Sequence, residues 1–171
     1  MNLPLFNDSM NSIPSSINKA CKSITLFIPG IPQPKQSARF KLIKTPERSF
    51  IGSYQTKKIK DNEKNIRSAV ISQLPEGFLP FKNGIVITQL HYSFPPLKSF
   101  SKKITARIEA GELIDKTTKP DLTDNLNKGV FDALQGLLYA NDSQICGLND
   151  CKKFYSKTPG IYLTMTEKEQ L

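Results

Sequence analysis

Proline divides this chain into short segments, each long enough for one helix or strand. Proline lacks a backbone N–H, so it cannot continue a helix interior or a central strand. The chain has 12 prolines, and many of them fall, often beside glycine, in the breaks at 29–34, 75–80, 95–96, 120 and 159–160. We therefore expect elements to end at these breaks, and the hydrophobic pattern between them to show the type of each element.

Hydrophobic spacing between these breaks predicts two helices and four strands. Apolar side chains recur every three or four residues at 54–74 and 123–139, which predicts amphipathic helices. Four further segments are short and rich in strand-forming residues: 23–28, 84–94, 144–155 and 161–167. The last two are predicted to form a hairpin. This order predicts an α+β fold, a single mixed β-sheet with two packed helices.

Three segments show no lasting periodicity. Residues 1–22 are predicted to be a flexible N-terminal tail, which leaves 23–171 as one folded domain. Residues 29–50 are predicted to form a loop that mixes basic and aromatic side chains. Such a loop can bind along a phosphate backbone, or its side chains can simply be solvated. Residues 97–120 predict a long polar loop with a helical piece at 104–110.

The charge balance favours a polyanionic partner. Lys and Arg number 24 against 15 Asp and Glu, a formal net charge of +9. Clustered cations gain affinity for phosphates by releasing condensed counterions, although many basic surfaces are only solvated. The candidate DNA-binding cations are Lys35, Arg39, Lys41, Lys57, Lys58 and Lys119.

Two classes of protein are excluded by composition. Because the chain has no run of 18 apolar residues, we expect no membrane-spanning helix. The three cysteines and single histidine support neither a disulfide framework nor a zinc site, which indicates a reduced, cytoplasmic protein.

The residues that carry chemistry are concentrated at 119–128. Pro120 favours a helix start there, and Asp121 and Asp124, three residues apart, would share one helix face. Two carboxylates this close form either a metal site or a helix start stabilised by its dipole. A third carboxylate, Asp142, follows the helix. A site of carboxylate oxygens without His or Cys ligands suits Mg²⁺. In a basic protein the substrate of such a site is expected to be nucleic acid, which indicates phosphodiester hydrolysis.

Three neighbouring residues have simpler interpretations. Lys128, four residues after Asp124, would offset charge on a phosphoryl transition state. Asp132 is expected to pair with Lys128 at i, i+4 rather than to reach a metal. His91 lies on a predicted strand without a matching partner, so we expect a structural role.

Together these residues resemble the signature of RusA-type Holliday junction resolvases. The motif residues are Lys119, Pro120, Asp121, Asp124, Asn125, Leu126, Lys128, Asp132, Ala133, Leu134, Asn141, Asp142 and Gln144. An upstream part of the resemblance comprises Ile28, Pro29, Gly30, Pro32, Pro34, Lys35, Arg39 and Phe40.

The resemblance implies a homodimeric endodeoxyribonuclease of DNA recombination and repair. Such an enzyme binds four-way junctions and, with Mg²⁺ or Mn²⁺, makes paired nicks across the crossover. By position, the resemblance implies Asp121, Asp124 and Asp142 as metal-binding catalytic residues, and Lys128 as the essential lysine.

One departure from the family pattern lies between the first two aspartates. The family separates them by one residue, whereas Leu122 and Thr123 separate Asp121 from Asp124 here. The extra residue predicts a small bulge or an earlier helical turn. If Asp121 is instead displaced, Asp115 is the other nearby acid, and the protein would bind junctions without cutting. The alternatives are thus a noncatalytic junction-binding protein and a related flap or fork nuclease.

Overall fold

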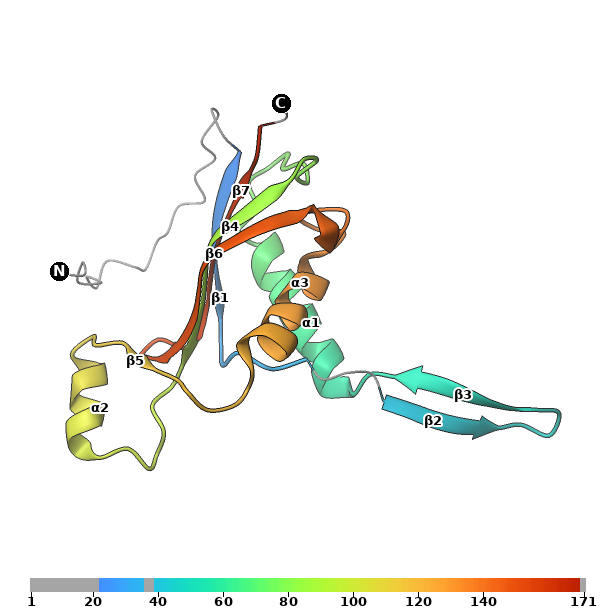
Figure 1. Ribbon diagram of the computed structural model, residues 1–171, viewed down its shortest axis with the longest axis horizontal. Coiled ribbons are helices and arrows are strands. Elements are labelled where there is room, and N and C mark those ends of the chain that lie inside the picture. Colours follow the sequence, from blue (N-terminus) through green and yellow to red (C-terminus); the bar gives the residue numbers. More distant parts are fainter. Residues whose placement is uncertain (1–21, 36–38, 170–171) are drawn as a thin grey trace.

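The computed structural model describes residues 22–35 and 39–169, so the tail predicted at 1–22 lies outside the described residues except for Lys22. Its main feature is a five-stranded mixed sheet with the strand order β1-β7-β4-β6-β5 (Figure 1). The strands are β1 (Ser23–Pro29), β4 (Ile85–Phe94), β5 (Ile114–Asp115), β6 (Ile145–Tyr155) and β7 (Gly160–Glu167). The predicted α+β class with a mixed main sheet is confirmed.

The hairpin predicted between the last two strands is wrong. β4 lies between them, because β6 pairs with β4 in parallel and β7 pairs with β1 and β4 antiparallel. The connection after β6 passes the end of β4, where Ser156 N donates to Phe94 O at 2.9 Å. The physical reason is burial: β4 is buried throughout residues 90–94, and a buried central strand needs hydrogen-bonding partners on both edges.

Two helices pack against this sheet, as predicted. They are α1 (Lys57–Ile71) and a combined helix made of the π-helical turn η1 (Leu122–Asn127) and α3 (Lys128–Leu134). Both contribute to a core whose members include Ile66, Val70, Leu126, Val130, Leu134, Leu90 and Leu163. The second helix ends before the predicted 139, because Gly136 takes a positive φ of 73°, where glycine meets no steric penalty.

Two shorter helical elements complete the fold, and one of them contributes Ile108 to the core. The helical piece predicted in the long polar loop is α2 (Lys102–Glu109), which lies near β5, on the opposite side of the molecule from β2 and β3 (Figure 1). The short 3₁₀ helix η2 (Asp142–Gln144) leads into β6. No helix in the described part of the chain is long and apolar enough to cross a membrane.

The loop predicted at 29–50 is in part a second sheet, so the single-sheet prediction is wrong. β2 (Arg39–Lys44) and β3 (Ser49–Tyr54) form an antiparallel pair. The turn between them closes where Thr45 N donates to Arg48 O at 2.8 Å, and Thr45 Oγ1 accepts from Arg48 N. We call this pair the β2–β3 arm, since it projects away from the main sheet (Figure 1). Its mixed apolar and basic composition hides the strand pattern in the sequence.

Candidate functional site

The second helix begins with a π-helical turn at the motif. Leu126 N donates to Asp121 O at 3.2 Å, a bond that spans five residues instead of the usual four. A π turn accommodates one extra residue in a helix. It therefore absorbs the additional residue between Asp121 and Asp124 while Leu126 and Val130 stay buried. The predicted bulge is confirmed.

The segment that leads to Asp121 is anchored to β6. Lys153 Nζ donates to Thr118 O at 2.8 Å and to Pro120 O at 2.7 Å, and Lys116 N donates to Lys153 O at 3.0 Å. These bonds hold the backbone immediately before Asp121. The sequence analysis missed Lys153, because its role depends on two carbonyls that are more than 30 residues away in the chain.

The predicted metal ligands lie on different elements. Asp121 is the N-terminal cap of η1, and its Oδ2 accepts from Asn125 Nδ2 at 2.7 Å. Asp124 lies in the first turn of η1, and Asp142 lies in the first turn of η2. Both are exposed, and neither side chain has a hydrogen bond or ion pair within the described residues.

The three aspartates do not form a ready-made metal cluster. Over residues 22–35 and 39–169, no three His, Cys, Asp or Glu side chains are grouped so that they could hold one ion. The donor chemistry of these aspartates nevertheless suits Mg²⁺, which is commonly bound through one or two carboxylates, waters and substrate phosphates. Exposed carboxylates without competing cations, such as Asp124 and Asp142, are available for that purpose.

Lys35 has a different role from the one predicted. It is only 8% exposed, and its Nζ lies 2.5 Å from Glu63 Oε1 and 2.6 Å from Asp132 Oδ2. The two predictions that Lys35 binds DNA and that Asp132 pairs with Lys128 are therefore wrong. Burial acts to lower the pKa of Lys35, but the hydrogen bonds to Asp132 and Glu63 outweigh it and raise the pKa above its usual value.

The close approach of two backbones explains why Lys35 reaches Asp132. Lys35 N donates to Asn125 O at 2.9 Å, which holds the segment after β1 against η1. A Cβ at Gly129 would lie 3.2 Å from Lys35 Cβ, so glycine at this position leaves the space the lysine stem needs. The helix spacing that suggested a partner for Asp132 could not reveal this contact between distant segments.

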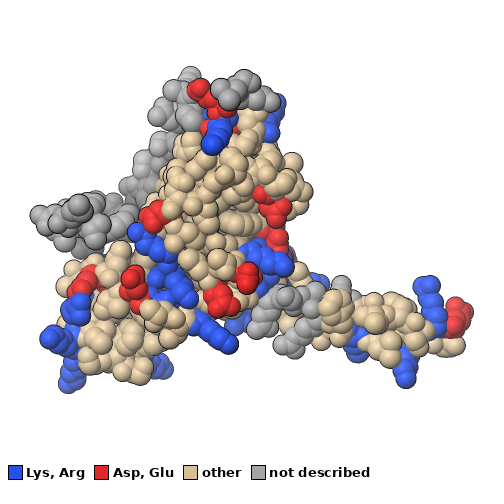
Figure 2. All heavy atoms as spheres, viewed as in Figure 1, with Lys and Arg blue, Asp and Glu red and all other residues tan. Residues whose placement is uncertain are grey.

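The other predicted cations lie at the surface. Lys41, Lys57, Lys58 and Lys119 are exposed, as is Lys128, which has no hydrogen-bond or ion-pair partner in the described part of the chain. The side chain of Arg39 lies outside the described residues. Figure 2 shows Lys and Arg spheres over α2 and along the β2–β3 arm.

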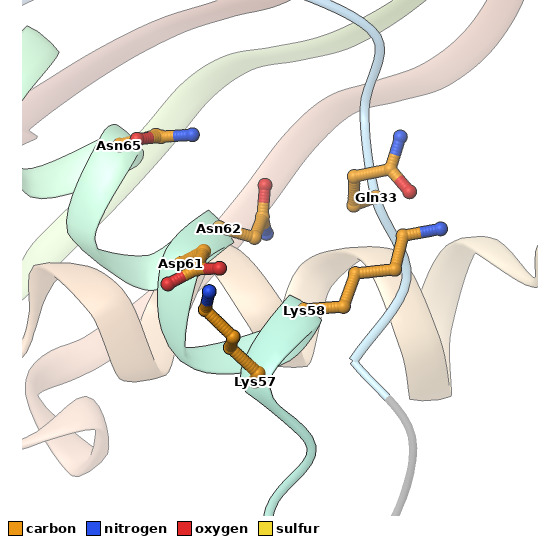
Figure 3. A pocket seen from close by; sticks show the side chains of 6 residues that line it. All are labelled: Gln33, Lys57, Lys58, Asp61, Asn62 and Asn65. Carbon is orange, nitrogen blue, oxygen red and sulfur yellow. The ribbon is translucent and has the colours of Figure 1, made fainter.

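A polar pocket of about 400 Å³ lies beside the first half of α1 (Figure 3). Its lining comprises Gln33, Lys57, Lys58, Asp61, Asn62 and Asn65. The two lysines and three amides offer donors for phosphate oxygens and for the edges of nucleobases. The two lysines were predicted from the sequence, but the three amides were not. The sequence held one signal for them, the i, i+3 spacing that places Asn62 and Asn65 on one face of α1.

His91 has a partner that the sequence did not reveal. Its Nε2 lies 2.6 Å from Asp150 Oδ2, and its Nδ1 lies 3.0 Å from Gln89 Nε2. Asp150 comes from β6, which the parallel register places beside β4. Burial acts to raise the pKa of Asp150, but hydrogen bonds from His91 and Lys152 outweigh it and lower the pKa. His91 is 7% exposed and joins two strands, which agrees with the structural role expected for it.

Two comparisons with known proteins bear on this arrangement. Residues 29–166, most of the chain, match the family described as Endodeoxyribonuclease RusA. A protein of Bacillus subtilis (strain 168), described as uncharacterized protein YqaN, is 42% identical over 79 residues. That similarity covers 46% of this chain and 54% of the relative, so the chain spans about half the length of the curated relative it matches.

Proposed function

Because the chain belongs to the RusA family of endodeoxyribonucleases, we propose that it is a Mg²⁺-dependent nuclease that resolves Holliday junctions by paired nicks across the crossover. The observation that carries the proposal is the start of the second helix. There the family match includes Asp121 and Asp124 on a π-helical turn that keeps both at the surface despite the extra residue. The net charge of +9 supports DNA as the substrate.

The proposed chemistry assigns a role to each exposed group. Asp121 and Asp124 would bind the metal ion, with Asp142 as a third ligand contributed once substrate is bound. When bound, Mg²⁺ supplies a nucleophilic water at neutral pH and stabilises the leaving oxygen. Lys128 follows Asp124 by one helical turn, so its ammonium would offset the negative charge that develops on the transferred phosphoryl group.

The proposed active form is a homodimer. Resolution requires cuts on two strands that are related by two-fold symmetry, and a C₂ dimer presents two sites with that relation. Exposed cations along α1 and the β2–β3 arm, including Lys41, Lys57 and Lys58, would contact the backbones of the junction arms.

A cleavage assay tests the proposal. Purified full-length chain with Mg²⁺ should convert a synthetic four-way junction into nicked duplexes, and a chelator should stop it. Asp124→Asn removes one charged ligand, so cutting should fall at least about a hundredfold while junction binding remains. Asp115→Asn is the matched control, because Asp115 is an exposed acid on β5 that should not affect cutting. Equal cutting by Asp124→Asn and the wild type would refute the proposal.

The lack of a three-ligand cluster among residues 22–35 and 39–169 favours one alternative, a noncatalytic junction-binding protein. In that case Asp121 and Asp124 only stabilise the helix start, and no divalent ion produces cleavage. Binding would still weaken steeply with salt, because phosphate contacts dominate. Absence of cleavage with Mg²⁺ and Mn²⁺, together with tight junction binding, would establish this alternative.

A further inference from the structure

The β2–β3 arm carries apolar side chains in solvent. Phe40, Leu42 and Ile51 are 74%, 54% and 71% exposed. Strand alternation puts Phe40 and Leu42 on one face, and the register places Ile51 directly opposite Leu42. A two-stranded sheet is marginally stable in water on its own, and a contiguous exposed apolar patch marks a binding surface. This face of the arm is therefore a candidate binding surface.

The opposite face of the arm combines rings with cations. Phe50 lies opposite Ile43, and Lys41 and Tyr54 share this face at neighbouring positions. The guanidinium carbon of Arg48 lies 5.4 Å from the centre of the Phe50 ring. A guanidinium and an aromatic ring placed together suit a ligand that has both negative charge and flat rings.

The charge of the arm indicates what that partner is. Lys41, Lys44 and Arg48 outnumber Glu47, the single acid between β2 and β3, and α1 follows with Lys57 and Lys58. The cores of protein interfaces are depleted in lysine. Proteins that bind single-stranded nucleic acid instead combine a basic track for phosphates with side chains on which bases stack.

We propose that the β2–β3 arm binds unpaired nucleotides on the face of Phe40, Leu42 and Ile51, with bases against Phe40 and phosphates held by Lys44 on the same face. Phe50 and Lys41 offer a similar pair of groups on the opposite face. Bases in an intact duplex are stacked on each other and offer only their edges to a protein, so an exposed phenylalanine gains little there. Unpaired bases occur in single strands, and in an open four-way junction the base pairs at the branch point lack a stacking neighbour on one side. The inference rests on the proposed function only for its choice of DNA as ligand.

Binding measurements with the full chain test this inference. Fluorescence anisotropy would give dissociation constants for a short single strand, a four-way junction and a blunt duplex, in buffer without a divalent ion so that nothing is cut. The double variant Phe40→Ser, Ile51→Thr removes two of the three apolar side chains of this face but keeps strand-compatible residues. Its affinity for the single strand and the junction should fall about tenfold, while that for the duplex should change by less than about twofold.

Two control variants identify the cause of any loss. Leu79→Ser removes an apolar side chain that is 64% exposed in the loop beyond the other end of α1, and it should leave all three affinities unchanged. Lys41→Gln with Lys44→Gln should weaken binding to all three DNAs and reduce the salt dependence. Circular dichroism would confirm that each variant is folded.

Three results would overturn the inference. The first is an unchanged affinity of the Phe40→Ser, Ile51→Thr variant for the single strand, and the second is an equal loss on single strand and duplex. The third is a change of this variant from dimer to monomer with unchanged DNA binding, which would assign the apolar face to a second copy of the chain. If the arm effect is found but no DNA is cut, only the proposed nuclease function fails.

Discussion

At the scale of single residues, the ion pairs of Lys35 connect three segments of the chain. The lysine follows β1, Glu63 lies on α1 and Asp132 lies on α3, so one ammonium group joins both helices to the end of a strand. Removing one partner of a buried ion pair costs much more than the pair itself contributes, because the remaining charges are left uncompensated. Here two carboxylates would remain beside each other.

The variant Lys35→Met should therefore lower the free energy of unfolding by about 2–3 kcal/mol, less than for a fully buried pair, since both acids are partly exposed. Urea denaturation at neutral pH would measure it. Adding Glu63→Gln and Asp132→Asn should restore most of the loss, whereas Lys60→Met on the exposed face of α1 should change stability by less than about 0.5 kcal/mol. A loss in Lys60→Met as large as that in Lys35→Met would contradict this explanation.

The stabilisation by Lys35 also has a defined pH range. Its pKa is raised in the folded state from the usual 10.5, so its contribution is complete below pH 10.5 and is lost as the pH rises through the higher folded value. Stability differences between the wild type and Lys35→Met should thus stay constant across neutral pH and diminish in strong alkali.

Residue-level prediction from the sequence worked where both partners share one element. The spacing of Asp121, Asp124 and Lys128 shows that they are neighbours on a helix. The partners of Lys35, His91 and Lys153 lie on elements brought together by sheet order and helix packing. No local pattern contains that information, so the sequence analysis assigned Lys35 to DNA and left His91 without a partner.

At the scale of elements, the π-helical turn explains how the motif tolerates an extra residue. The added residue is confined to η1, so α3 keeps Val130, Ala133 and Leu134 buried. Deleting Thr123 should therefore convert η1 into an ordinary α-helical turn while leaving the packing of α3 intact. We expect a free energy of unfolding within about 1 kcal/mol of the wild type.

A deletion inside α3 provides the matched control. Removing Phe131 rotates one part of the helix against the other by about 100°, which moves buried positions towards solvent. This variant should unfold at a much lower temperature or fail to fold. Thermal unfolding followed by circular dichroism compares the two, and equal destabilisation by both deletions would show that η1 is not a separable insertion.

The elements themselves were predictable to different degrees. Strong periodicity identified both core helices and four of the five strands of the main sheet, whereas the two-residue strand β5 lies within the segment predicted to be a polar loop. The sequence order suggested a hairpin after 144, but the burial of β4 places that strand between β6 and β7. The β2–β3 arm was missed because its apolar residues face solvent on both sides, so the alternation of buried and exposed positions that marks a strand is absent.

At the scale of the whole molecule, the proposed dimer predicts which products a mixture of active and inactive subunits will form. Two active sites in a C₂ dimer act on one junction, so resolution requires both to be competent. When equal amounts of wild type and Asp124→Asn subunits associate at random, about a quarter of the dimers contain two competent sites and about half contain one. The dimers with one competent site should cut only one of the two strands of the junction.

A supercoiled plasmid that extrudes a cruciform distinguishes these outcomes, because two cuts linearise it and one cut leaves a nicked circle. Subunits should be mixed under conditions that allow exchange. The yield of linear product should then fall to about a quarter while nicked circles accumulate, as expected for random dimers. A mixture of wild type and Asp115→Asn should give the wild-type products. If the linear product falls only to half, with no rise in nicked circles, the two cuts do not depend on paired subunits and the dimeric mechanism is wrong.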